Sequence, residues 1–202
     1  MPAPGPRAST APGRTSTAPG LRASSTIFLD RDGTINVKAP EGQYVTSPAG
    51  LMLLPGAAGA VARLNAAGLL VVLVTNQRWL SGPSADPAGY AAVHARLVQL
   101  LAAEGGRLDA AYHCPHAAGT CDCRKPAPGM LRRAAREHLL DLGKAVIVGD
   151  SDSDLMAGRA AGTSTILIRP GAAGPAAPGA DAVASDLPAA VRLILQARNA
   201  AA

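Results

Sequence analysis

The sequence predicts an α/β fold, in which a doubly wound parallel sheet carries helices on both faces. Short apolar runs alternate with helical patterns from residue 26 to residue 198, which is typical of consecutive strand–helix units. The run over 69–75 is apolar up to Thr75, as expected of a strand buried on both faces. Acidic and polar side chains directly follow several of these runs. In such sheets, ligands bind beyond the carboxyl ends of the strands.

Individual elements have local signals at their ends. Gly68 can end a helix over 56–67. Asp86 can cap the next helix, with Pro87 in its first turn. The predicted strands cover residues 26–30, 69–75, 145–149, 164–168 and 181–184. The predicted helices cover residues 56–67, 86–104, 128–141, 154–161 and 188–198, and a loop covers 170–180.

The composition is that of one globular domain. Of 202 residues, 48% are apolar but only 2% are aromatic, so Ala, Val, Leu and Ile must form the core. Arg7, Arg14 and Arg22 precede the first acidic residue, and without them 16 basic and 14 acidic residues remain. There is no Lys/Arg block, no secretory signal and no apolar run of about 18 residues. We therefore expect a cytoplasmic protein that binds neither nucleic acid nor membrane.

The first 24 residues differ from the rest. They consist almost entirely of Pro, Ala, Gly, Ser, Thr and Arg, and cannot bury enough apolar surface to offset the entropy of ordering. The sequence predicts a disordered tail over 1–24 and a folded domain over 25–202. An organellar transit peptide is the alternative, although its amphipathic helix would be interrupted by Pro and Gly.

Two carboxylates one residue apart end the first apolar run. Alternate side chains of a strand share a face, so Asp30 and Asp32 are expected to lie together, and Gly33 allows a turn just after them. Two such carboxylates repel each other unless a cation relieves them, and Mg²⁺ prefers oxygen ligands. One carboxylate can attack phosphorus while the other transfers a proton.

Groups suited to phosphate occur at two further places. The Thr75 hydroxyl can donate to a phosphate oxygen, and Asn76 can orient the nucleophile. Lys125 would place a point charge on the phosphoryl group, and Arg124 offers a planar fork for a second oxyanion. Each motif alone is also compatible with an ordinary polar turn.

The order of these motifs resembles the haloacid dehalogenase superfamily of phosphatases, over about residues 26–170. The motifs that carry the resemblance are Asp30-Arg31-Asp32-Gly33-Thr34, Thr75-Asn76, Arg124-Lys125 and Gly149-Asp150-x-x-x-Asp154.

What the resemblance implies is a two-step hydrolysis through an aspartyl-phosphate. Asp30 would be the nucleophile and Asp32 the acid and base, with Thr75 and Lys125 stabilising the transferring group. Mg²⁺ would be held by Asp30, the backbone carbonyl of Asp32, and Asp150. In the last motif Asp154 would support the site, whereas Asp152 stands at the wrong spacing.

Three cysteines and a histidine form a second constellation, composed of Cys114, His116, Cys121 and Cys123. Their number and type match a closed tetrahedral zinc site, with no position left open for catalysis. A structural Zn²⁺ is therefore predicted, in a loop between the second and third predicted helices. His113 is expected to be a bystander.

The run Cys-Pro-His…Cys-Asp-Cys-Arg-Lys-Pro is similar to a zinc-loop subgroup that includes heptose 1,7-bisphosphate and histidinol-phosphate phosphatases. A small phosphorylated sugar or amino alcohol is implied, with D-glycero-D-manno-heptose 1,7-bisphosphate preferred. Arg78 and Trp79 replace a small pair usual in the subgroup, and a short loop between His116 and Cys121 favours histidinol phosphate instead. The substrate-binding residues implied are Asn76, Arg78, Arg124 and Ser151.

Two alternatives to hydrolysis remain. A phosphotransferase or mutase would need a cap domain to exclude water, and segments 36–55 and 78–86 are too short for one. A non-catalytic zinc-binding interaction module would not need the acidic and basic motifs to be intact. The sequence therefore predicts a capless, monomeric phosphatase.

Overall fold

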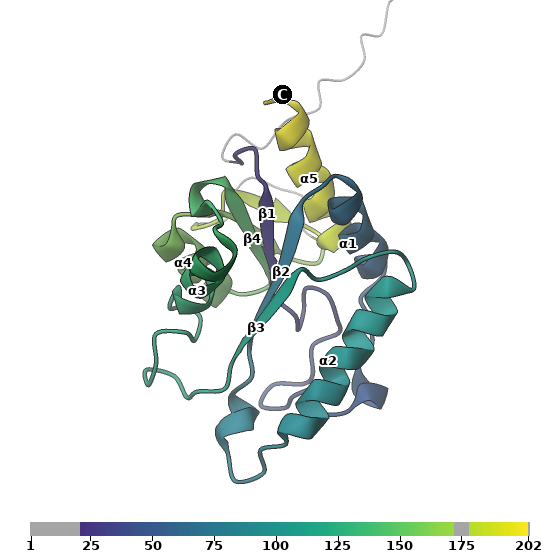
Figure 1. The fold of residues 1–202 in the computed structure, drawn as a ribbon, viewed down its shortest axis with the longest axis vertical. Coiled ribbons are helices and arrows are strands. Elements are labelled where there is room, and N and C mark those ends of the chain that lie inside the picture. Colours follow the sequence, from purple (N-terminus) through teal and green to yellow (C-terminus); the bar gives the residue numbers. More distant parts are fainter. Residues whose placement is uncertain (1–20, 172–177, 202) are drawn as a thin grey trace, which may run out of the picture.

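A computed structural model of the chain describes residues 21–171 and 178–201. Within these residues, six strands form one parallel sheet in the order β3-β2-β1-β4-β5-β6 (Figure 1). The strands are β1 (Thr26–Leu29), β2 (Leu70–Asn76), β3 (Ala110–Cys114), β4 (Ala145–Gly149), β5 (Ser164–Ile168) and β6 (Ala182–Ala184). The helices are α1 (Ala57–Ala66), α2 (Pro87–Ala102), α3 (Gly129–His138), α4 (Asp152–Ala161) and α5 (Leu187–Asn199). The predicted doubly wound fold is confirmed.

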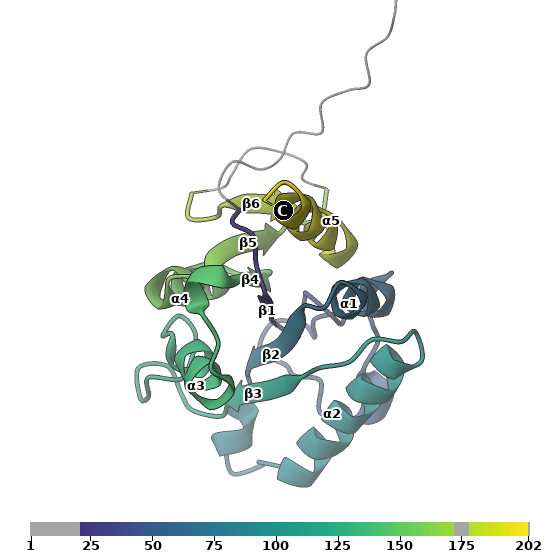
Figure 2. The same ribbon diagram turned by 45° about the horizontal axis from the view of Figure 1, so that its top comes forward.

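Side-chain alternation along β1 separates the core into two layers. Ile27 and Leu29 pack with apolar residues of α1, α2 and α5, whereas Phe28 faces the opposite way and packs with α3 and α4. Figure 2 shows these two groups of helices on opposite faces of the sheet. The central strand β1 pairs with β2 on one side and β4 on the other. Strands β2 and β3 are added on one side of β1, and strands β4 to β6 on the other. The order of the strands therefore switches at β1, and ligand crevices form at such switch points.

The β1–α1 and β2–α2 connections at the carboxyl edge hold no cap domain, as predicted. Between β1 and α1 the chain forms one 3₁₀ turn, η1 (Pro48–Gly50), and between β2 and α2 another, η2 (Arg78–Ser81). Both segments are described in full. The β1–α1 connection folds back over the sheet, where its residues 38–45 line a cavity.

Strand β3 is an element that sequence reasoning missed. Only Tyr112 and Cys114 of its five residues are buried, because β3 lies at the edge of the sheet and has no continuous apolar run. The four cysteine and histidine residues are therefore not all in a loop, since Cys114 is the last residue of β3. Helix α3 also ends three residues early, because Leu139 adopts a left-handed conformation with φ of 53°.

Most of the expected tail, residues 1–20, lies outside the described residues, as do residues 172–177 of the expected 170–180 loop. The last residues assigned to the tail contact the domain. Leu21 packs against the core, Ser24 is buried, and Arg22 Nη2 donates to the Gly162 carbonyl at 2.9 Å. Among the described helices, none has the length and apolarity needed to cross a membrane.

Candidate active site

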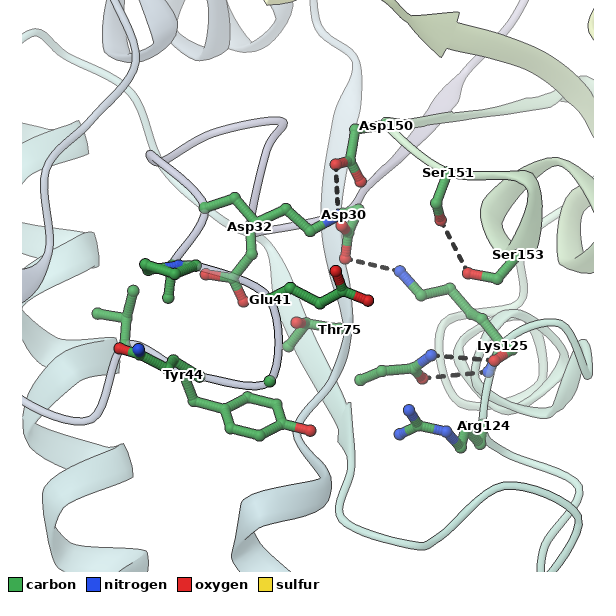
Figure 3. Close-up of a pocket in the computed structure, with 17 residues that line it drawn as sticks. Asp30, Asp32, Glu41, Tyr44, Thr75, Arg124, Lys125, Asp150, Ser151 and Ser153 are labelled. Carbon is green, nitrogen blue, oxygen red and sulfur yellow. Dashed lines mark hydrogen bonds and ion pairs between the residues drawn. The ribbon is translucent and has the colours of Figure 1, made fainter.

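A cavity of about 330 Å³ opens at the carboxyl edge of the sheet, and it collects side chains from four separate segments (Figure 3). These segments are the end of β2, the stretches that follow β1 and β4, and the stretch that precedes α3. The charged and hydroxyl-bearing residues that line the cavity are Asp30, Asp32, Lys38, Glu41, Tyr44, Thr75, Arg124, Lys125, Asp150, Ser151 and Ser153. Most of the predicted site residues therefore meet in one place.

Asp30 continues the line of β1, since its backbone N–H donates to the Val148 carbonyl at 3.0 Å. The residue is 8% exposed, and its carboxylate accepts a hydrogen bond from Lys125 Nζ at 2.6 Å. Burial raises the pKa of Asp30 to about 7, although the Lys125 ammonium opposes that rise. A carboxylate with this pKa can be ionised at neutral pH while little hydrated, which favours its use as a nucleophile.

Lys125 joins two buried carboxylates. Its ammonium lies 2.6 Å from Asp30 Oδ1, 2.6 Å from Asp154 Oδ1 and 2.8 Å from the Val74 carbonyl. These three partners match the three N–H donors of an ammonium. Burial lowers the pKa of Lys125, but the two carboxylates outweigh that effect and hold it above its usual value. Asp154 thus supports Lys125 from behind the cavity and does not line it.

The polar end of β2 fixes the Lys125 segment. Asn76 Oδ1 accepts from the Lys125 N–H at 3.1 Å, and Asn76 Nδ2 donates to the Lys125 carbonyl at 3.0 Å. The Asn76 amide therefore orients Lys125, whereas we expected it to orient Asp30. Thr75 lines the cavity, and its hydroxyl oxygen accepts from Gln77 Nε2 at 2.9 Å.

Asp150 lies at the end of β4 and completes a set of oxygen donors. Carboxylate oxygens of Asp30, Asp150 and Asp154 lie within 4.8 Å of one another. A Cβ at Gly33, where φ is 88°, would overlap the Asp150 carboxylate, so only glycine leaves this carboxylate its place. Oxygen donors of this kind suit Mg²⁺.

Lys38 is a second ammonium at this acidic set, and its Nζ lies 2.7 Å from Asp150 Oδ2. Three carboxylates are thus paired with two ammoniums, Lys38 and Lys125. The remaining negative charge favours a bound cation.

Asp32 is held apart from the acidic set. Its carboxylate accepts from Asn36 Nδ2 at 2.9 Å and Gln77 Nε2 at 3.0 Å, and pairs with the buried Arg31 guanidinium at 3.0 Å. The expectation that Asp30 and Asp32 lie on one strand face is wrong, because β1 ends at Leu29 and Asp32 lies beyond it, in an isolated bridge with Asn36. Both still line the same cavity (Figure 3).

The other predicted substrate-binding residues divide into two groups. Arg124 and Ser151 line the cavity, and the Ser151 hydroxyl donates to Asp154 Oδ2 at 2.6 Å. Ser151 is the N-cap residue of α4, and its backbone N–H donates to the same oxygen at 3.2 Å. Arg78 and Trp79 are not among the described residues that line this cavity. Both lie in η2, and Trp79 Nε1 donates to Gln77 Oε1 at 2.8 Å instead.

The cysteine and histidine cluster lies beside Arg124. The three sulfur atoms are 3.3–3.6 Å apart, and His116 Nδ1 lies 3.3 Å from Cys123 Sγ and 3.6 Å from Cys114 Sγ. Zinc with Zn–S bonds of about 2.3 Å places tetrahedral ligands about 3.8 Å apart, so the cluster fits this ion closely. Cys121 Sγ accepts from the Arg124 N–H at 3.3 Å, and the His116 carbonyl accepts from the Arg124 guanidinium at 3.3 Å.

Comparisons with known proteins agree with this geometry. A family model described as HAD-hydrolase-like matches residues 122–190. A Bordetella bronchiseptica protein named D-glycero-beta-D-manno-heptose-1,7-bisphosphate 7-phosphatase is 42% identical over 146 residues, which cover 72% of this chain and 80% of the relative. A Thermosynechococcus vestitus protein named D-glycero-D-manno-heptose-1,7-bisphosphate 7-phosphatase is 41% identical over 190 residues, covering 83% of this chain and 94% of the relative.

The chain belongs to the heptose-1,7-bisphosphate phosphatase family of HAD-like hydrolases. A crystal structure of the D,D-heptose 1,7-bisphosphate phosphatase from B. bronchiseptica, complexed with magnesium and phosphate, is also similar. Its TM-score is 0.77 at 40% identity, covering 85% of this chain and 98% of that chain. The resemblance predicted from the sequence motifs is confirmed.

Three residues of this chain contact the site although the sequence analysis predicted no role for them. Arg31 and Gln77 are buried and bond Asp32, while Lys38 bonds Asp150. Arg31 and Gln77 are each adjacent in sequence to a motif residue. A charged or amide side chain at the end of a buried strand could therefore have indicated that they belong to the site. Lys38 had no such signal, because the loop that returns it to the cavity is irregular.

Proposed function

We propose that this protein is a Mg²⁺-dependent phosphatase that removes the 7-phosphate from D-glycero-D-manno-heptose 1,7-bisphosphate. The observation that carries the proposal is the buried Asp30–Lys125–Asp154 network at the end of β1. Asp30 and Lys125 both line one cavity, which supports the role of nucleophile for Asp30 and of a cation facing the phosphate for Lys125. The names of the relatives at about 40% identity supply the substrate.

The first chemical step is attack by Asp30 on the phosphorus atom. The Asp30–P bond forms as the bond between phosphorus and the sugar oxygen breaks, and Asp32 gives its proton to that oxygen. The positive charge of Lys125 stabilises the negative charge of the transferring group, and the Thr75 hydroxyl donates to one of its oxygens. The buried position of Asp30 limits its hydration before attack.

The second step hydrolyses the aspartyl-phosphate. Asp32, now ionised, removes a proton from water as the water oxygen attacks phosphorus. The Asp30 carboxylate then leaves, and inorganic phosphate is released. Asp32 regains its proton in this step, so the cycle closes.

Two metals fit the chain's own residues. Asp30 and Asp150, with the backbone carbonyl of Asp32, would hold Mg²⁺, which supplies charge neutralisation for the phosphate oxygens. Cys114, Cys121, Cys123 and His116 would hold a structural Zn²⁺. The bonds from Cys121 and His116 to Arg124 would then fix that guanidinium at the cavity.

The second phosphate of the substrate is assigned to Arg124. Its guanidinium fork suits an oxyanion, and the Tyr44 hydroxyl points toward it across the cavity (Figure 3). Histidinol phosphate is the alternative substrate, since only four residues separate His116 from Cys121. We further propose that the protein is cytoplasmic, because its three thiols suit a metal in a reducing compartment, and that it acts as a monomer.

The test compares kcat/KM for heptose 1,7-bisphosphate, heptose 7-phosphate and histidinol phosphate. The bisphosphate is expected to be preferred, and Arg124→Ala should lower its kcat/KM by about 10- to 100-fold, as for a lost charge-assisted hydrogen bond. The same variant should change heptose 7-phosphate hydrolysis far less. Arg136→Ala, an exposed arginine on α3, is the matched control.

Asp30→Asn should lower all three activities by about 10³-fold or more, since it removes the attacking oxygen while conserving volume. A preference for histidinol phosphate in the wild type would overturn the substrate assignment. Near-normal turnover by Asp30→Asn would overturn the mechanism itself.

A further inference from the structure

A chain of hydrogen bonds leads from η2 to Asp32. Gln77 is fully buried just after β2, and its Nε2 donates to Asp32 Oδ2 at 3.0 Å and to Thr75 Oγ1 at 2.9 Å. Its Oε1 accepts from the Trp79 indole Nε1 at 2.8 Å. Every polar atom of the Gln77 side chain is thus engaged.

The Trp79 indole determines which way the Gln77 amide points. An indole N–H can only donate, so the amide oxygen must face Trp79 and the NH₂ group must face Asp32. With the amide reversed, its oxygen would face the Asp32 carboxylate, and two acceptors would oppose each other in a buried place. Trp79 therefore selects the amide orientation that holds Asp32.

The remaining donors to Asp32 do not replace Gln77. Arg31 Nε and Asn36 Nδ2 both donate to Oδ1, at 3.3 and 2.9 Å. Oδ2 accepts from Gln77 and pairs with Arg31 Nη2 at 3.0 Å. Removing the Gln77 bond leaves Oδ2 with Arg31 Nη2 as its one partner, so the position of this oxygen is less firmly held.

We propose that Trp79 is a positioning residue for the acid–base Asp32 and acts on it through Gln77. The inference rests on the proposed function, because it assumes that Asp32 protonates the leaving oxygen. Trp79 does not line the described cavity, so contact with substrate does not account for its place. Its effect is on the direction in which the Asp32 proton is delivered.

Dependence on the leaving group distinguishes this role from a purely structural one. A sugar alkoxide needs a proton as it leaves, whereas para-nitrophenolate is stable without one. The ratio kcat/KM reports the reaction up to loss of the alcohol and excludes hydrolysis of the aspartyl-phosphate. A misdirected Asp32 should therefore slow only the sugar phosphate in this parameter.

The experiment measures kcat/KM of Trp79→Phe with heptose 1,7-bisphosphate and with para-nitrophenyl phosphate, both in saturating Mg²⁺. Trp79→Phe keeps a ring but removes the N–H. We expect about a tenfold loss with the sugar phosphate, a fraction of the usual contribution of a general acid, and less than about twofold with the aryl phosphate. Ser81→Ala, which removes another side-chain hydrogen bond from η2, should change neither.

A second variant protects the test against a folding defect. Gln77→Leu should lose at least as much activity with the sugar phosphate, and it should also slow the aryl phosphate because it removes the bond to Thr75. Adding Trp79→Phe to Gln77→Leu should cause no further loss with the sugar phosphate, because both changes break one chain of bonds. Equal losses with both substrates in Trp79→Phe, or additive losses in the double variant, would overturn the inference.

Asp32→Asn separates this inference from the proposed function. If Asp32→Asn selectively loses sugar phosphate hydrolysis while Trp79→Phe does not, the positioning role is wrong and the proposed function stands. If Asp32→Asn is not selective, or the wild type hydrolyses neither phosphate, Asp32 is not the acid and both proposals fail.

Discussion

The carboxylate network around Lys125 and the cysteine cluster around Cys121 lie side by side at the carboxyl edge of the sheet. The two regions differ in whether cationic side chains pair with their acidic groups. The network pairs three carboxylates with two ammoniums, Lys38 and Lys125. The cluster brings three thiols and an imidazole together, and no side-chain ammonium or guanidinium of the described residues bonds its sulfurs.

This difference indicates what a metal does in each place. The carboxylate network has its own cations, so it can fold without metal and needs Mg²⁺ for chemistry. In the cluster, burial and hydrogen bonds to the other thiols raise the pKa of Cys123 to about 12. Hydrogen bonds from Cys123 and from the Arg124 N–H outweigh burial and lower that of Cys121 to about 7. A thiol with a raised pKa keeps its proton at neutral pH, and Zn²⁺ would replace that proton on binding.

Lys125→Met should produce the largest effect, because it would leave Asp30 and Asp154 facing each other without a cation. We expect the free energy of unfolding of the metal-free protein to fall by about 3–5 kcal/mol, measured by urea denaturation. Saturating Mg²⁺ should restore part of this loss. Lys144→Met, at an exposed lysine, is the control. A loss below about 1 kcal/mol would show that Lys125 does not balance the network.

Cys121→Ser should affect the other region. Elemental analysis should find about one zinc per chain in the wild type and much less in the variant. The free energy of unfolding should fall by about 2 kcal/mol, and Arg124 should lose its fixed position with the Cys121 bond. Asp122→Asn, in the same loop, should keep both metal and stability. Freshly purified wild-type protein without bound zinc would contradict the comparison.

The pH dependence of Mg²⁺ binding should be the smallest effect. Burial raises the pKa of Asp30 to about 7, so at pH 6 this ligand is mostly protonated and must release a proton when Mg²⁺ binds. Affinity should therefore rise by up to about tenfold from pH 6 to pH 8, measured by titration calorimetry. Asp30→Asn should remove most of this dependence. An affinity that does not change with pH would mean that Asp30 is already ionised or does not bind the metal.

Strong local signals made much of the chain predictable. Continuous apolar runs predicted β2 and β4, and acidic residues directly after β1 and β4 predicted the cavity. Strand β3 was missed because an edge strand with two buried side chains has no such run. The shared strand face of Asp30 and Asp32 was a wrong inference, because the chain leaves the sheet after Asp30, and Asp32 instead forms a bridge with Asn36.

By itself the sequence determined the fold class, the acidic and basic motifs and the cysteine cluster, since each depends on residue type and short spacing. Only the tertiary structure decided which polar atoms meet. It directed Asn76 to Lys125, and Trp79 to Gln77 and away from the cavity. Contacts such as that of Lys38 with Asp150 join residues 112 positions apart. Their partners are set by how loops pack over the sheet, which no local pattern specifies.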